Sequence, residues 1–172
     1  MKITYKTQEK DFLDFYLYTT FKSERIKKKR RNSVIIFSVI PLAFAMYFFV
    51  DDNTTVASYF GAITIICALF YPKYFDWRYK KHFQYFIQDN LSDRFNEPAE
   101  LEINKDSLFS KDVSGEGRIK LSEINEINET QTHFFFQVAS GASLIIPKRE
   151  LDFTDEFRSK LESLGLSISL DI

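Results

Sequence analysis

The residue types that most often carry out chemistry in proteins are few in this 172-residue chain. The two histidines, His82 and His133, lie in different regions, and neither belongs to a known catalytic or phosphate-binding motif. Cys67 is the single cysteine, which excludes an internal disulfide and a four-cysteine zinc site. Its apolar neighbours predict that Cys67 behaves as a small buried hydrophobic residue.

Acidic side chains occur in close pairs, but nothing around them indicates a catalytic role. We interpret Glu126 with Glu129, and Asp155 with Glu156, as solvated surface positions. The segment Gly115-Glu116-Gly117 predicts a turn. Catalysis requires several reactive groups to converge at one pocket. We therefore expect no enzyme activity, no catalytic residue, no metal site and no cofactor.

Two uncharged apolar runs dominate the first half of the chain. Residues 34–50 and residues 56–71 contain no Asp, Glu, Lys or Arg. As helices they would be roughly 24–26 Å long, which is close to the ~30 Å hydrocarbon thickness of a bilayer. Residues 72–75 lengthen the second run. The pattern predicts transmembrane helices at residues 34–50 and 56–75.

The polar residues 51–55 connect the two runs and predict the external turn of a hairpin. Asp52 or Asn53 is suited to the turn itself. Thr54 or Thr55 is suited to cap the second helix.

Cations flank both runs at the ends away from this loop. Residues 22–31 hold seven cations and one Glu, whereas the loop holds no cation. The positive-inside rule then places both basic flanks, and both termini, in the cytoplasm. The residues predicted to lie at the membrane interface are Lys27, Lys28, Lys29, Arg30, Arg31, Lys73, Trp77 and Arg78.

Three other interpretations compete with a membrane hairpin. The runs could form the buried hairpin of a soluble protein, because about 16 residues is a borderline length for a span. The first run could be a secretory signal with Ala43-Phe44-Ala45 as its cleavage site. The basic segment could bind nucleic acid, but its position beside an apolar run favours a topology role with attraction to anionic lipid. We therefore expect a lipid bilayer, and no nucleic acid, as a partner.

The segments beside the spans predict further helices. Residues 1–33 begin with an alternating strand pattern at residues 2–6, and a helix from about Glu9 is expected to run through the basic segment into the first span. Residues 76–96 continue the second helix to about Asn90. Aromatic residues on both helices predict that the two pack on each other.

Residues 97–172 differ in charge and in pattern. They carry 8 Lys and Arg against 15 Asp and Glu, whereas residues 1–96 carry 15 against 9. Short alternating segments separated by turn residues predict an antiparallel meander. Expected strands are residues 99–104, 107–113, 118–121, 122–130, 133–139, 142–146 and 166–170. Thr154 to Leu164 predicts a helix with Thr154 as cap, Phe157 and Leu161 inward, and Gly165 as its stop.

The order of these segments resembles the YcxB-like family of bacterial membrane proteins. The resemblance covers nearly the whole chain and rests on the segments 126–136 and 145–149 followed by Phe153 and a helix. It implies a multi-pass protein of the bacterial cytoplasmic (inner) membrane. It also implies a C-terminal domain similar to pleckstrin-homology (PH) folds, with a bent antiparallel sheet capped by one helix. The expected fold class is thus membrane α + β.

The resemblance brings no established reaction, so function is expected from charge and topology. Lys148 and Arg149 are a candidate binding pair, although their position also suits a strand end. We expect a protein-interaction, scaffold or regulatory module at the cytoplasmic face, with a protein partner that the sequence does not identify. Two alternatives are a small oligomeric transporter or channel component and a membrane-bound toxin-immunity protein. Homo-oligomerisation is left open.

Overall fold

The computed structural model describes residues 1–171, which form two compact units. The β unit joins Met1–Phe15 to the segment that begins at Tyr85, and the hairpin unit comprises Tyr16–Gln84. The sequence pattern predicts that residues 1–33 are separate from the domain at residues 97–172. In the structure the first strand pairs with β2 (Pro98–Ile103), so segments before and after the hairpin contribute to one sheet.

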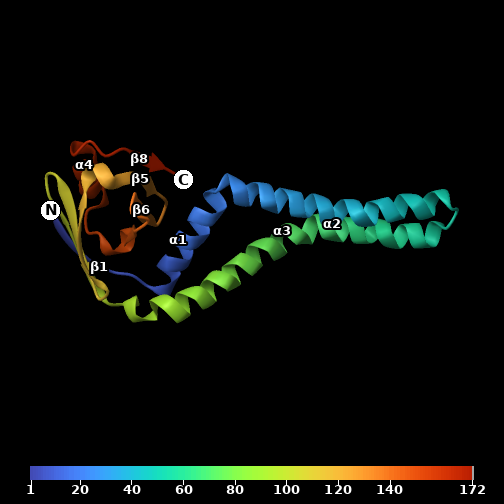
Figure 1. The fold of residues 1–172 in the computed structure, drawn as a ribbon, viewed down its shortest axis with the longest axis horizontal. Coiled ribbons are helices and arrows are strands. Elements are labelled where there is room, and N and C mark those ends of the chain that lie inside the picture. Colours follow the sequence, from blue (N-terminus) through green and yellow to red (C-terminus); the bar gives the residue numbers. More distant parts are fainter. Residues whose placement is uncertain (172) are drawn as a thin grey trace. The chain divides into compact units, whose positions relative to one another are not determined.

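Three helices carry the chain into and out of the hairpin unit (Figure 1). They are α1 (Glu9–Lys22), α2 (Glu24–Val50) and α3 (Thr54–Leu91). The predicted uninterrupted helix through the basic segment is wrong at one residue. Ser23 has an extended backbone, with φ −64° and ψ 122°, and therefore ends α1 and precedes α2.

For the hairpin loop, the predicted turn residue is confirmed and the predicted helix cap is wrong. Asp52 adopts the left-handed conformation, with φ 57°, as the turn requires. The predicted cap at Thr54 or Thr55 is wrong, because α3 already begins at Thr54. Asn53 caps the helix, since its Oδ1 accepts a 3.3 Å hydrogen bond from the backbone N–H of Val56.

Aromatic contacts hold α2 against α3. The ring centroids of Phe37 and Tyr71 lie 4.6 Å apart, and those of Phe48 and Phe60 lie 5.8 Å apart. Only 6% of the most apolar 18-residue stretch of either helix is buried. Both helices are long and apolar enough to cross a membrane. In the buried hairpin of a soluble protein the same stretches would be covered by other parts of the protein.

The β unit contains two four-stranded sheets. The first has the order β1-β2-β3-β4, with bounds Lys2–Lys6, Pro98–Ile103, Ser107–Asp112 and Gly115–Lys120. The second has the order β7-β6-β5-β8, with bounds Ser143–Pro147, His133–Val138, Ile124–Glu129 and Ile168–Leu170. Three short 3-10 turns join these elements: η1 (Ser92–Arg94), η2 (Leu121–Glu123) and η3 (Lys148–Glu150).

The prediction of one antiparallel sheet needs two corrections. The turn η2 separates β4 from β5, so the strands divide into two sheets rather than one bent sheet. The last strand, β8, pairs in parallel with β5, with Ile127 opposite Ile168. The parallel pairing arises because the helix α4 (Thr154–Ser163) carries the chain back before β8 begins.

Helix α4 packs onto the core of the β unit through two residues. Phe157 and Leu161 are fully buried, which confirms their predicted inward orientation. Gly165 ends the helix with φ +76°, a conformation that favours glycine, as predicted. Thr154 is the first helical residue and not the cap, which is Phe153 without a side-chain hydrogen bond.

Strand β6 is buried on both faces. Phe134 and Phe136 point into the core, where both rings meet Phe157 edge-on. On the opposite face, Phe135 meets the ring of Phe15 from α1 at 5.4 Å, also edge-on. This second buried face places β6 against the start of α1 and brings together the polar residues described next.

Candidate functional site

The most deeply buried charge of the β unit is Asp11, in the first turn of α1. Its side chain is completely covered. The backbone N–H of Gln8 donates to Asp11 Oδ2 at 2.7 Å, an arrangement that caps the helix. The carboxylate also lies at the helix N-terminus, where the backbone dipoles favour negative charge. A neighbouring residue in the sequence thus helps to orient this carboxylate.

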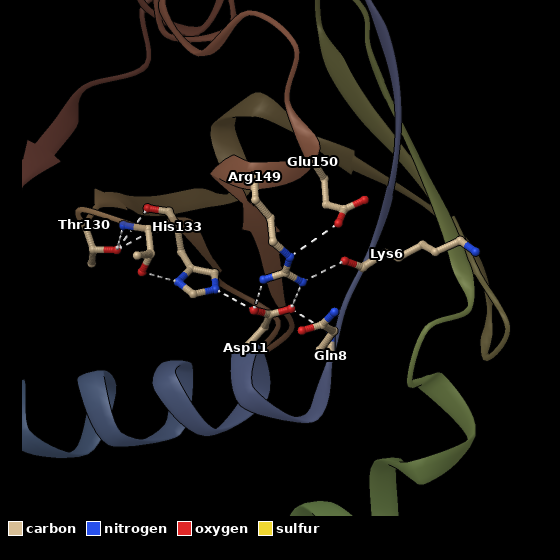
Figure 2. Close-up of polar contacts among 8 residues, drawn as sticks. Lys6, Gln8, Asp11, Thr130, His133, Arg149 and Glu150 are labelled. Carbon is tan, nitrogen blue, oxygen red and sulfur yellow. Dashed lines mark hydrogen bonds and ion pairs between the residues drawn. The ribbon is translucent and has the colours of Figure 1, made fainter.

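Two side chains, one from β6 and one from the turn η3 after β7, meet Asp11 (Figure 2). Arg149 in η3 donates to both carboxylate oxygens, with Nη1 and Nη2 each at 2.6 Å. His133, at the start of β6, places its Nε2 2.9 Å from Asp11 Oδ1. A two-pronged arginine–carboxylate contact is among the stronger polar contacts in proteins and fixes orientation as well as distance. The cluster therefore joins the N-terminal helix to the second sheet.

The imidazole of His133 bridges two oxygens. Its Nδ1 lies 2.8 Å from the Thr132 hydroxyl, and its ring stacks on Phe135 with centroids 5.2 Å apart. Because an ionised Asp11 can only accept, the Nε2–H of His133 donates to it; in a neutral imidazole Nδ1 then accepts from the Thr132 O–H. A hydroxyl–imidazole–carboxylate chain results.

Electrostatics keep Asp11 ionised despite its burial. Burial alone raises the pKa of this carboxyl, but hydrogen bonds from Arg149 and His133 outweigh burial and hold the pKa well below its ordinary range. In return, the hydrogen bond to Asp11 raises the pKa of Arg149. The Arg149 side chain is 40% exposed, so water reaches the guanidinium but not the carboxylate beneath it.

A second buried carboxylate, Glu129, lies at the end of β5. Glu129 is 2% exposed and accepts hydrogen bonds from Lys148 Nζ at 2.6 Å and from Arg158 of α4 at 2.6 and 2.8 Å. The bonds from Arg158 are the main reason that the pKa of Glu129 falls to about 2. The cluster joins η3 and α4 to β5.

These clusters explain what the candidate pair Lys148 and Arg149 does within the chain. The two residues are adjacent and follow β7, yet each faces a different buried carboxylate. Both are thus engaged internally. The same geometry corrects one expectation, because Glu129 is a buried ion-pair partner and not a solvated surface residue. Asp155 and Glu156 are exposed, as predicted.

The chain from Thr132 through His133 to Asp11 has the residue types of a nucleophilic site. Its geometry suits a structural role better, because Arg149 already occupies both oxygens of the carboxylate. The groove described below is not lined by Asp11 or His133. Within residues 1–171, no group of three or more His, Cys, Asp or Glu side chains could hold a metal ion.

A groove of about 340 Å³ opens between the two sheets of the β unit. The hairpin of β3 and β4 forms one side, and the start of β7 forms the other. Its polar wall is organised by Arg94, which donates to Asp112 at 2.6 Å and to the Ser114 hydroxyl at 2.7 Å. Glu97 and Glu116 add two further carboxylates, so the lining carries net negative charge.

The groove also has apolar lining residues, and it borders the open edge of the first sheet. Buried Tyr5 lies at the base, and burial is the main cause that raises its pKa to about 12. Strand β4 is the last of its sheet, and its two glycines, Gly115 and Gly117, leave the adjacent backbone without side-chain cover. An uncovered edge strand beside a groove can accept an extended peptide.

Comparison with known proteins relates one part of the chain to a family. A family model described as YcxB-like protein matches residues 103–160. The chain contains a YcxB-like domain. Neither the curated proteins nor the solved structures include a match to the chain. The predicted family is therefore confirmed, over about a third of the length rather than nearly all of it.

The matched residues contain the whole Glu129 cluster but only part of the Asp11 cluster. The YcxB-like domain runs from the end of β2 into α4 and holds all three members of the Glu129 cluster. It also holds His133 and Arg149, but Asp11 lies outside it. The carboxylate that His133 and Arg149 both face thus comes from the N-terminal segment, outside the matched residues.

The residues predicted at a membrane interface all lie on α2 and α3. Lys27, Lys28, Lys29, Arg30 and Arg31 are on the first two turns of α2, and Lys73, Trp77 and Arg78 follow the apolar part of α3. Arg30 pairs with Asp76 across the hairpin at 2.8 Å. Lys29 and Arg78 both line one pocket between α2 and α3.

Sequence reasoning missed Asp11, Glu129, His133 and Arg158 as members of buried clusters. For Asp11 a signal existed, because an acid in the third position of a helix can cap its N-terminus. His133 directly precedes three phenylalanines and so begins a buried strand. No local signal pointed to Glu129 or Arg158, whose pairing depends on how α4 packs.

Proposed function

We propose that this chain is an integral membrane protein that tethers an interaction module to the inner face of a bacterial cytoplasmic membrane. The observation that carries the proposal is the exposure of apolar side chains along α2 and α3. Phe49, Ile65 and Leu69, for example, are 68%, 61% and 64% exposed. Such a surface is unfavourable in water and favourable in hydrocarbon. The basic flanks support an orientation with both termini inside.

The module itself is the β unit, which we propose to be PH-like. Two sheets capped by α4 support that likeness, and the parallel strand β8 is an addition to it. We propose that the groove and the β4 edge receive an extended segment of a partner protein. The acidic lining favours a segment with cationic side chains.

A photo-crosslinking amino acid at Val113 tests this interaction. Val113 is 56% exposed and lines the groove, so contact with a partner is expected there in native membranes. Phe153 is the matched control, because it is also apolar and is 69% exposed but lies outside the groove. The proposal expects a discrete adduct from Val113 alone. Equal adducts from both positions, or none from Val113, would contradict it.

A further inference from the structure

A pocket of about 320 Å³ lies between α2 and α3 within the hairpin unit. Lys29 and Ser33 line it from α2, and Tyr74, Arg78 and other residues line it from α3. Two contacts across the hairpin lie near the pocket. The Arg30–Asp76 ion pair lies level with it, because both residues fall within the segments that line it. The stacked rings of Phe37 and Tyr71 lie on the side of the apolar runs.

The pocket lies where both apolar runs stop. Ser33 immediately precedes the run at residues 34–50, and Tyr71 is the last residue of the run at residues 56–71. If these runs lie in hydrocarbon, the pocket lies at the depth of the lipid headgroups. Tyrosines at this depth are typical of the membrane–water interface.

The lining has the chemistry of an anion site. Lys29 and Arg78 supply two cations, and no carboxylate lines the pocket. Within residues 1–171, neither cation forms an ion pair. The nearby carboxylate of Asp76 is engaged by Arg30 instead. Hydroxyl groups of serine and tyrosine add donors that suit phosphate oxygens.

We infer that this pocket binds the phosphate of an anionic glycerophospholipid headgroup. The inference rests on the proposed membrane insertion of α2 and α3. A pocket of this volume accommodates a small ligand, and basic pockets between membrane helices on the cytoplasmic side suit anionic headgroups. The site fixes one lipid molecule, in contrast to the diffuse attraction of the remaining surface lysines.

The lone tryptophan provides the readout. The indole ring of Trp77 lies 6.0 Å from the ring of Tyr74, which lines the pocket. The full chain is reconstituted in vesicles that contain brominated phosphatidylglycerol or brominated phosphatidylcholine, and quenching of Trp77 reports the lipid beside it. Phosphatidylglycerol is expected to quench more strongly at equal mole fraction.

Paired variants separate a site from general charge attraction. Lys29→Gln with Arg78→Gln removes both pocket cations, and we expect the preference for phosphatidylglycerol to fall about fivefold per cation removed. Lys28→Gln with Lys73→Gln is the control, because it removes two cations from the same helices outside the pocket. The control is expected to lose less of the preference than the pocket variant, because its two cations contribute only to the diffuse attraction. Equal losses in the two double variants would overturn the site.

The outcomes also separate this inference from the proposed function. Quenching by brominated phosphatidylcholine shows that Trp77 meets lipid, and each variant must retain it to count as inserted. Equal quenching by both lipids would overturn the headgroup site and leave the membrane helices intact. No quenching by either lipid would overturn both. Competition with soluble glycerol phosphate is the last experiment. If glycerol phosphate abolishes the preference for phosphatidylglycerol at millimolar concentration, the site binds free phosphate and the lipid assignment is wrong.

Discussion

Replacing Arg149 by Met should destabilise the β unit by about 3 kcal/mol, the cost of leaving a buried carboxylate without its charge partner. Asp11 is fully buried, and Arg149 binds both of its oxygens. The remaining donors, the Gln8 N–H and His133, satisfy the carboxylate only in part. The aliphatic stem of Met preserves much of the packing, so the loss reports the interaction rather than a cavity.

Urea unfolding of the full chain in nonionic detergent, followed by pulse proteolysis, measures this change. With ordinary urea dependence, the midpoint should fall by about 1–3 M. Arg118→Met is the matched control, because Arg118 is exposed on β4 and lies outside both buried clusters. If Arg149→Met and Arg118→Met had the same urea midpoint, the Asp11–Arg149 pair would make no net contribution to the free energy of unfolding.

The pH dependence of the urea midpoint is a second measurement that distinguishes Arg149→Met from the parent chain. The pKa of Asp11 lies below its ordinary value in the folded chain, so its stabilising contribution is present above the unfolded-state pKa of about 4 and is lost as the pH falls below that value. Without Arg149 the pKa of Asp11 rises towards the value that burial favours. Because the folded variant then takes up the proton as well, acidification to below pH ~4 should lower the midpoint of the variant less than that of the parent chain.

Replacing Ile65 by Asp should strongly reduce membrane integration. Ile65 lies near the middle of the second apolar run and is 61% exposed. In hydrocarbon a central Asp costs about 2.5–3.5 kcal/mol on insertion scales, whereas on a water-facing surface the same change is close to neutral. The environment of α3 thus decides the size of the effect.

Resistance to alkaline carbonate extraction provides the measurement. Most of the Ile65→Asp protein should move to the soluble or aggregated fraction, while the parent chain stays in the membrane pellet. Val113→Asp is the control, because Val113 is similarly exposed at 56% but belongs to the β unit. If Ile65→Asp stayed in the pellet as fully as Val113→Asp, α3 would not lie in hydrocarbon.

Local sequence predicted those parts of the fold that depend on neighbouring residues. The absence of charge in residues 34–50 and 56–71 indicated two long helices, and the polar loop between them indicated their turn. Alternation in residues 99–104 indicated β2, whose odd-numbered side chains Leu101 and Ile103 are buried. In these cases one period or one composition determines the element.

Contacts between distant residues account for what could not be predicted. Strand β1 pairs with β2 across the whole hairpin, and Asp11 meets Arg149 from 138 positions away. The burial of Glu129 depends on α4, which places Arg158 beside it. A single sequence carries no signal for such pairs, because each partner looks like an ordinary surface residue in its own segment.

The central claim is that α2 and α3 cross a bilayer with both ends of the chain inside, and cysteine labelling tests it most directly. In a Cys67→Ala background, Asn53→Cys lies in the hairpin loop and Asp171→Cys follows β8. Intact spheroplasts are treated with a membrane-impermeant maleimide, before and after lysis. The account predicts labelling of Asn53→Cys from outside and labelling of Asp171→Cys only after lysis. Labelling of both positions from outside would contradict it.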